Sequence, residues 1–561
     1  WANPFEDHAL HTRKGTGVLV NLPDARHRGN LVTRMEHGDL ELELEFMMAP
    51  GSNSGIYLQG RYEVQLRDSW GVGRPTFGDC GGIYERWDDS RPEGQQGYEG
   101  HPPAIDACAA PGVWQRLRIV FQAPRFDADG RKVANARILR VELNGYLVQH
   151  DIELTGPTRG PYLPGEAAEG PLVFQGDHGP VAFRHIRYRT YEGKAPTWEP
   201  FEYEVYYGPY DWVPAFDTLQ PAFRDQIEAL NWQVARQENE FAIRFRGRIH
   251  LPKGGPWRFE FVTNGNGYVL LDGRMIFDQR WWGRDTVLTL EAGSHELVVT
   301  YSKNEGWLQG RLGLFVEGPD VRPTPLHQPA SFLLSQPVPP ILAQAEAPVR
   351  PLRHFLDYPL PGGGRKRLVH LVSMGFPQGL HYSFDMDRAA LVQVWRGHFL
   401  DATPMWYSRG DGSARPDGAV LHTGIEPMWV RLSANDALVL ADTLPAEARY
   451  RTHGYSFDAE GRPTFHYEVY GLQVRQTIHP DAAGRMLHCA LAVEGQPESG
   501  LWLRLASAAD IRAMDDGWWA IDGRRYLLHL PKGAQTRVVE AANTRHLLVR
   551  PAPTLEWELV W

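Results

Sequence analysis

The residues best suited to chemistry stand at every second position of one short segment. Within SNSGIYLQGRYEVQLRDSW, residues 52–70, these polar residues are Arg61, Glu63, Gln65 and Arg67. Side chains two positions apart lie on one face of a β-strand, so the segment predicts a strand whose apolar residues point to a core. A carboxylate beside guanidinium and amide groups offers a proton acceptor and hydrogen-bonding partners for a polar ligand.

Two further segments carry side chains of the same kind. The segment DCGGIYERWDDS, residues 79–90, is expected to form a second strand and contributes Tyr84, Glu85, Trp87 and Asp88. The segment FQGDHGPVAFRHIRYR, residues 174–189, contributes Asp177, His178 and Arg184. Aromatic rings stack on the apolar faces of sugars, and charged or amide groups bind sugar hydroxyls. On adjoining strands these residues predict a carbohydrate site.

Each of these features also has a purely structural interpretation, which stays open at this point. The polar face of residues 61–67 fits a solvated sheet face with cross-strand ion pairs, one of them between Arg184 and Glu63. The turn QGDHG places Asp177 where an aspartate commonly caps backbone amides. The ring of Trp87 fits the edge of a hydrophobic core.

Composition narrows the classes of partner. The chain has 561 residues, a net charge of -10 and no block of Lys or Arg, which argues against nucleic acid and anionic membranes as partners. It contains no apolar run long enough to span a bilayer. The first residue is Trp1, so we expect an exported protein, secreted or periplasmic, whose targeting segment has been removed. The sequence leaves the oligomeric state open.

Short alternating strands bounded by turn residues predict an all-β, multidomain protein. Asn144-Gly145 between two such strands predicts a tight hairpin, and the best helical periodicity is in residues 221–235. The strand pattern pauses near residues 190–200, and residues 319–351 are rich in proline and poor in charge. We therefore expect domains at 1–190, 200–318 and 352–561, with residues 319–351 as a linker.

Several motifs in residues 5–190 resemble, in order, the 3-keto-disaccharide hydrolase family. They are NSGIYLQGRYEVQLRDSWG, GGIYERWD, APGVWQRLRIVFQAPRFDADGRK, VELNGYLV, GPTRG and GPLVFQGDHGPVAFRHIRYR. The resemblance implies a concanavalin-like β-jelly roll that cleaves 3-keto-glycosides.

The second domain resembles a protective-antigen β-sandwich module through residues 247–282, including the Asp-Gly turn in LLDG at 270–273. Sugar-binding members of that module hold calcium with two adjacent aspartates. The matching residues here are Asn264 and Gly265, so a scaffold role is expected. The third domain is expected to be a further β-sandwich, with an open role.

The chemistry that the family resemblance implies gives each candidate residue a role. A ketone at C3 of a sugar acidifies the C2 proton, so a base removes that proton and the C1 substituent leaves by elimination, after which water can add. Glu63 is the expected base on a ligand-accessible face, and His178, beside Asp177, is the general acid or an alternative base. A divalent metal ion held by carboxylate and histidine is a further expectation. The expected substrate-binding residues are Arg61, Gln65, Arg67, Tyr84, Glu85, Trp87, Asp88 and Arg184.

Two other functions fit the same residues. If a β-bulge follows Gln65, Asp68 returns to the face of Glu63, and the two carboxylates are then similar in spacing to those of concanavalin-fold retaining β-glucanases. The match is incomplete, because that motif has Asp where this chain has Gln65 and Glu where it has Asp68. Such an enzyme would hydrolyse unoxidised glycans. A noncatalytic carbohydrate-binding protein is the third hypothesis.

Overall fold

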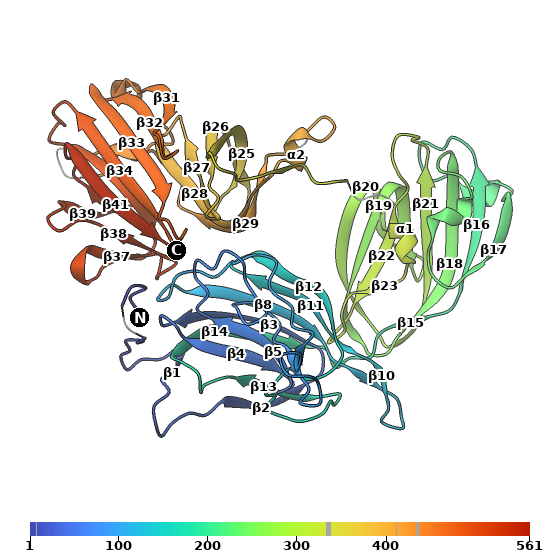
Figure 1. Cartoon of the computed structure of the whole chain (residues 1–561). Coiled ribbons are helices and arrows are strands. Elements are labelled where there is room, and N and C mark those ends of the chain that lie inside the picture. Colours follow the sequence, from blue (N-terminus) through green and yellow to red (C-terminus); the bar gives the residue numbers. More distant parts are fainter. Residues whose placement is uncertain (7, 333–337, 411, 434–436) are drawn as a thin grey trace. The chain divides into compact units, whose positions relative to one another are not determined.

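The computed structural model describes residues 1–6, 8–332, 338–410, 412–433 and 437–561, except for the side chains of 280–282. Strands make up 52% of it and helices 4%, which confirms the predicted all-β, multidomain class. The chain forms two compact units, one of Trp1–Tyr188 with Pro340–Trp561 and one of Arg189–Pro339 (Figure 1). Within the described ranges, no helix has the length and apolar character needed to cross a membrane.

The first unit begins with a jelly roll of two antiparallel sheets (Figure 1). In strand order, the larger sheet consists of β1 (Val18–Asn21), β14 (Val181–Thr190), β3 (Leu40–Met48), β8 (Gln115–Gln122), β11 (Ala136–Leu143) and β12 (Tyr146–Leu154). The smaller sheet consists of β2 (Leu31–His37), β13 (Gly170–Phe174), β4 (Asn53–Leu58) and β5 (Tyr62–Arg67). Short hairpins are formed by β6 (Arg86–Trp87) with β7 (Gly97–Tyr98), and β9 (Arg125–Phe126) with β10 (Lys132–Ala134).

Alternating burial places the core of the jelly roll between its sheets. On β3 every second residue from Leu40 to Phe46 is fully buried, and the glutamates between them are partly exposed. On β5 the side chains of Tyr62, Val64 and Leu66 belong to the same core cluster as those of β3. The predicted orientation of these three residues is confirmed, so residues 61, 63 and 65 lie on the opposite face of the smaller sheet.

Two tight hairpins set the register of the strands that matter for the site. The predicted turn between β11 and β12 is present, with φ of 51° at Asn144 and 82° at Gly145. A similar turn joins β4 to β5, with φ of 54° at Gln59 and 67° at Gly60, and the amide of Arg61 donates to the carbonyl of Leu58 at 2.9 Å. Positive φ at both central residues is typical of type I′ turns, which join two strands in hairpins with two-residue loops.

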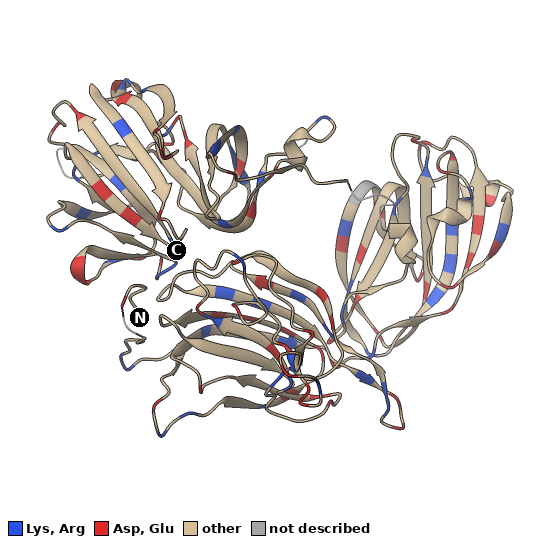
Figure 2. Ribbon diagram, in the orientation of Figure 1, with Lys and Arg blue, Asp and Glu red and all other residues tan. Residues whose placement is uncertain are grey.

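The outer face of the larger sheet is covered by paired charges of both signs, which Figure 2 shows interspersed along the strands. Arg118 lies 2.6 Å from Glu41, and Arg184 on β14 lies 2.6 Å from Glu45 on β3. Exposed pairs of this kind contribute only about 0–1 kcal/mol each. They keep the face polar and leave it without a patch of one sign.

The second unit, Arg189–Pro339, is built around one antiparallel sheet. In order its strands are β17 (Phe223–Ile227), β16 (Phe201–Tyr207), β18 (Phe241–Leu251), β21 (Gly293–Lys303), β19 (Gly255–Leu271), β22 (Leu312–Glu317) and β23 (Thr324–Pro325), with β15 (Thr197–Trp198) on β18 and β20 (Arg274–Leu290) on β19. The residues with the best helical periodicity, 221–235, form β17 and a 3-10 helix at Trp232–Ala235, because Phe223–Ile227 pairs with β16. Within the expected linker, β23 pairs with β22, and the short helix α1 (Pro329–Phe332) follows. The protective-antigen resemblance of this unit stays a prediction.

The C-terminal part of the first unit contains three further sheets. One consists of β24 (Leu342–Ala343), β28 (Ala390–Asp401), β27 (Leu380–Asp385), β26 (Arg365–Gly375) and β25 (Arg350–Pro359), and β29 (Arg415–His422) also pairs with β28. The short helix α2 (Thr403–Trp406) lies between β28 and β29 in the chain. A second consists of β30 (Trp429–Arg431), β35 (Leu501–Ala508), β40 (Thr544–Val549) and β39 (Thr536–Ala541). The third consists of β31 (Arg451–Phe457), β32 (Pro463–Val469), β33 (Leu472–Pro480), β34 (Met486–Glu494), β41 (Thr554–Val560), β38 (Tyr526–His529), β37 (Trp518–Ile521) and β36 (Ile511–Ala513).

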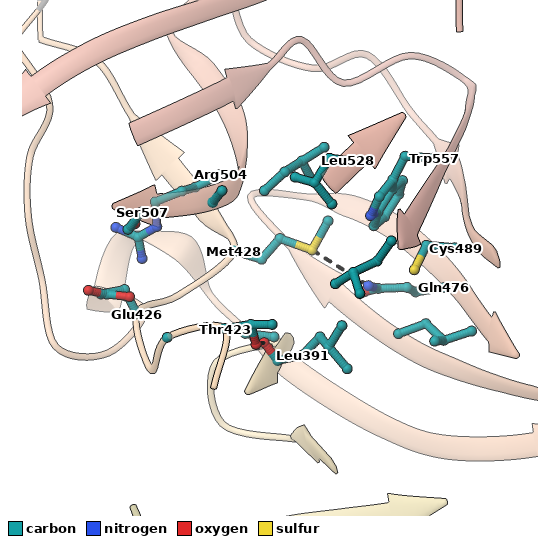
Figure 3. A pocket seen from close by; sticks show the side chains of 16 residues that line it. Leu391, Thr423, Glu426, Met428, Gln476, Cys489, Arg504, Ser507, Leu528 and Trp557 are labelled. Carbon is teal, nitrogen blue, oxygen red and sulfur yellow. Dashed lines mark hydrogen bonds between the residues drawn. The ribbon is translucent and has the colours of Figure 1, made fainter. Parts of the chain in front are cut away.

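These C-terminal strands enclose a small cavity (Figure 3). Met428, Gln476, Cys489 and Trp557 line it, and the Gln476 amide donates to the Met428 sulfur at 3.6 Å. Its volume of about 50 Å³ corresponds to a few water molecules. A sugar ring does not fit in this cavity.

Candidate active site

Glu63 lies on the outer face of the smaller sheet and is buried. It is 3% exposed, although its face was expected to be open to ligand. Segments distant in the sequence cover the edge of β5 that does not pair with β4. The amide of Glu63 donates to the Thr158 hydroxyl at 3.1 Å, and its carbonyl accepts from the amide of Tyr84 at 3.2 Å. A cavity of about 430 Å³ elsewhere in this unit is lined by residues 71–75 and 102–106, among others, and Glu63 is not part of its lining.

The space for the Glu63 carboxyl group exists because residue 55 is glycine. Strands β4 and β5 pair so that Tyr57 lies opposite Glu63 and Gly55 lies opposite Gln65. A Cβ atom at residue 55 would stand 2.1 Å from Glu63 Oε1 and 2.9 Å from its Cδ. The glycine of the NSGIY motif therefore serves close approach of a side chain, a recognised use of glycine in a strand.

Burial changes the acid strength of this carboxyl group. Loss of hydration raises the pKa of Glu63 to about 8, and the nearby charge of Asp177 adds to the rise, while a hydrogen bond with Tyr57 opposes it. The phenol of Tyr57 is itself 4% exposed, and its pKa is raised by burial and by Glu63. Tyr57 is therefore a neutral donor at any physiological pH, and Glu63 exchanges its proton near pH 8.

Asp177 and His178 form a dyad beside this buried pair. Oδ1 of Asp177 lies 2.6 Å from Nδ1 of His178, and the side chains are 38% and 54% exposed. When Nδ1 donates to the carboxylate, Nε2 remains available to a ligand. The charge of Asp177 acts on both members of the buried pair, because it raises the pKa of Glu63 and of Tyr57.

Three amide side chains complete the group. Gln175 donates from Nε2 to the Tyr57 hydroxyl at 3.3 Å. The side-chain oxygens of Gln175, Gln65 and Asn53 are buried and have no hydrogen-bond partner in the described structure. Since the great majority of buried polar atoms are paired in folded proteins, this concentration of unpaired acceptors indicates a place for donors that are not part of the chain.

The expected arginines take different positions. Arg61 donates to the carbonyls of Gln59 at 2.7 Å, Gly165 at 3.0 Å and Glu169 at 3.4 Å, so it holds a loop. Arg67, at the open end of β5, has a side chain 55% exposed and stands 4.0 Å from Asp79. Arg184 lies in the other sheet, paired with Glu45 and stacked 4.1 Å from the Trp114 ring, so the suggested pair with Glu63 is wrong.

The segment of residues 79–90 forms a short hairpin strand, β6, in place of the longer strand expected. Tyr84 borders the site through its backbone bond to Glu63 and packs against the Phe77 ring at 5.7 Å. Glu85 pairs with Arg159 at 3.2 Å, and the guanidinium of that arginine lies 3.7 Å over Trp87. Asp88 accepts from the amide and hydroxyl of Ser90 at the end of β6.

Asp68 does not join Glu63. Strands β4 and β5 pair without a register shift, from the partners Leu58 and Tyr62 at the turn to the partners Asn53 and Arg67 at the other end. The bulge that would rotate Asp68 onto the face of Glu63 therefore does not form. The Asp68 carboxylate accepts instead from the amides of Gly51 at 2.8 Å and Trp70 at 3.3 Å. The carboxylate pair of a retaining glycosidase is therefore not assembled here.

The metal ion expected from the sequence stays a prediction. Among the described residues, no group of three or more His, Cys, Asp or Glu side chains is arranged to hold an ion. The carboxyl group of Glu63 is bonded to Tyr57, and the Asp177 carboxylate to His178. We therefore assign no step of the reaction to a protein-bound metal.

The sequence reading missed Tyr57, Gln175, Gly55 and Asn53. The position of Tyr57 could have been predicted from the sequence, because the short turn at Gln59-Gly60 places Tyr57 opposite Glu63. Gln175 was not, because its place follows from the pairing of β13 with β4 across a long stretch of chain.

Solved structures similar to this chain include two candidate glycosyl hydrolases from Parabacteroides distasonis. The first is 28% identical in sequence, and the match covers 29% of this chain and 68% of the chain of that structure, with a TM-score of 0.22. The second is 21% identical, covers 32% of this chain and 88% of its own, and has a TM-score of 0.22. The A domain of a subtype-switched epithelial adhesin from Candida glabrata, in complex with β-lactose, is 10% identical, covers 23% of this chain and 84% of its own, with a TM-score of 0.19.

The comparison with curated proteins finds no match. The comparison with family models finds one over the jelly roll that carries Glu63, Asp177 and His178. Residues 2–189 of the chain match the 3-keto-alpha-glucoside-1,2-lyase-like domain.

Proposed function

We propose that the jelly roll cleaves 3-keto-glycosides, with Glu63 as the base that removes the C2 proton. The family match over residues 2–189 supports a carbohydrate-active enzyme, and the description of that domain is the reason for proposing a 3-keto-glycoside as substrate. The observation that carries the residue assignment is the buried carboxyl group of Glu63, with a pKa raised to about 8, beside the Asp177–His178 dyad. Catalytic carboxyl groups that exchange protons near neutral pH are typically raised by burial in this way.

The reaction balances with groups of the chain alone. The Glu63 carboxylate takes the C2 proton, and the electron pair of the C–H bond forms an enolate on the C3 oxygen. Return of that pair restores the ketone, forms the C1–C2 double bond and breaks the bond from C1 to the leaving oxygen. His178, held by Asp177, acts as the general acid and gives a proton from Nε2 to that oxygen. Addition of water across C1–C2 would complete a hydrolysis.

Charge on the enolate needs a nearby donor or cation. Arg61 is unsuited, because its guanidinium is bonded to three backbone carbonyls. Arg67 was also expected to bind substrate, and its side chain is largely exposed at the end of the same strand. We assign it this role.

The proposal is tested with matched methyl glucosides, one 3-keto and one unoxidised, incubated with the full chain with and without a chelator. We expect release of methanol from the 3-keto compound alone, unaffected by chelation, and its loss in Glu63→Gln. Glu36→Gln is the matched control, because Glu36 is exposed on β2 of the same sheet. Cleavage of the unoxidised glucoside at an equal rate would overturn the substrate class, and binding of both without turnover would leave a carbohydrate-binding protein.

A further inference from the structure

Three unpaired amide oxygens surround Gly55 on the face of the smaller sheet that carries Glu63. Asn53 and Gly55 share a face of β4 because they are two residues apart, and Gln65 lies opposite Gly55 on β5. On the other side, the amide of Gln175 donates to the carbonyl of Gly55 at 2.9 Å. Gln175, Gly55 and Gln65 thus form one row across three adjacent chain segments, and the Glu63 carboxyl fills the gap above the glycine.

The hydrogen bonds around Tyr57 determine which atom of Gln175 is free. Tyr57 bonds the Glu63 carboxyl group, and a phenol that donates its only proton to a carboxyl oxygen accepts from an N–H group. The bond of 3.3 Å between Gln175 and the Tyr57 hydroxyl therefore uses the amide nitrogen. This leaves Oε1 of Gln175 as a buried acceptor without a partner.

The unpaired oxygens of these amide side chains indicate a binding site for a hydrogen-bond donor. Gln65 is 4% exposed, and its Oε1 has no partner in the described structure. A buried amide oxygen without a donor is costly, and a fold retains it where a ligand or water completes the bond. The three oxygens are buried, and the residues Asn53, Gln175 and Asp177 are partly exposed, so this end of the row lies toward solvent.

We infer that Asn53, Gln65 and Gln175 form an acceptor cradle that binds hydroxyl groups of a glucose-like ring on both sides of Glu63. The inference rests on the proposed function for the position of the ring and extends it by naming the residues that select the substrate. The cradle presents acceptors, so it recognises the hydroxyls that the oxidised sugar retains and not the ketone. A sugar that lacks a recognised hydroxyl leaves an amide oxygen buried and unpaired, which is the strongest form of discrimination available to such a site.

The test measures binding, so it does not depend on turnover. Methyl α-glucopyranoside and its 2-, 3-, 4- and 6-deoxy analogues are titrated into the full chain by calorimetry or ligand-observed NMR. We expect at least one deoxy analogue to bind about 10-fold more weakly or worse. In Gln175→Met, which keeps the length of the side chain and removes both polar atoms, we expect the penalty at one position to shrink to about 2-fold.

Two further variants keep the inference falsifiable. Gln65→Met is expected to remove the penalty at a different hydroxyl, and Gln122→Met, a glutamine of β8 in the other sheet, is expected to change none. The same deoxy pattern in all variants, or no saturable binding of the parent glucoside, would overturn the cradle. A preserved deoxy pattern without cleavage of the 3-keto compound would instead remove the proposed reaction and leave the cradle in place.

Discussion

Replacing Glu63 by glutamine is expected to change how stability depends on pH. The side chain is 3% exposed, and burial raises its pKa from 4.5 to about 8. The unfolded chain releases this proton at a lower pH than the folded chain, so the wild-type free energy of unfolding falls as pH rises between these values. At about 1.4 kcal/mol for each pH unit, the whole range corresponds to about 5 kcal/mol, of which about 4 kcal/mol falls between pH 5 and pH 9.

Glutamine does not titrate, so Glu63→Gln lacks this loss. We expect the variant to gain stability relative to wild type by an amount that grows with pH and levels off above pH 8. Urea unfolding of both proteins at pH 5, 7 and 9, followed by tryptophan fluorescence, measures the difference. Glu36→Gln, the exposed carboxyl of the same sheet, is expected to follow the wild-type dependence. A difference between Glu63→Gln and wild type that is constant with pH would refute the argument that burial holds this carboxyl in its protonated form.

The remaining predictions concern the groups around the base. Tyr57→Phe removes the hydrogen bond that lowers the pKa of Glu63, so the rise of kcat/KM with pH is expected to move above pH 8; an unchanged midpoint would contradict that bond. Asp177→Asn removes a nearby negative charge, so the same midpoint is expected to move to lower pH, with a smaller kcat because His178 loses its partner; a shift to higher pH would contradict the assignment. Gly55→Ala places a Cβ where the Glu63 carboxyl lies, so we expect kcat/KM to fall about 100-fold or more with a small change in unfolding temperature, and wild-type kinetics would show that the carboxyl position is unimportant.

Local periodicity was enough to predict the orientation of β5 but not its burial. Tyr62, Val64 and Leu66 face the core because alternation is a property of the strand itself. The 3% exposure of Glu63 arises in the folded structure, where Thr158 and Tyr84 come from other parts of the chain and bond its backbone. A pattern within one segment carries no information on which loop will cover it.

Pairings between neighbouring strands in the sequence could be predicted, and contacts that depend on the arrangement of distant strands could not. The turn residues Asn144-Gly145 determine a hairpin locally, and that prediction is confirmed. The pair of Arg184 with Glu63 requires two strands to be in one sheet, whereas β14 and β5 lie in different sheets. The unpaired side-chain oxygen of Gln175 can likewise be identified only after β13 has paired with β4.

The central claim is that Glu63 removes the proton at C2 of a 3-keto-glycoside. The most direct measurement follows deuterium in a methyl 3-keto-glucoside labelled at C2, by mass spectrometry of product and remaining substrate. The account predicts that the label passes to solvent during cleavage by wild type, and that Glu63→Gln neither cleaves the glucoside nor exchanges the label. Cleavage by wild type with the deuterium retained at C2, or label exchange by Glu63→Gln at the wild-type rate, would contradict it.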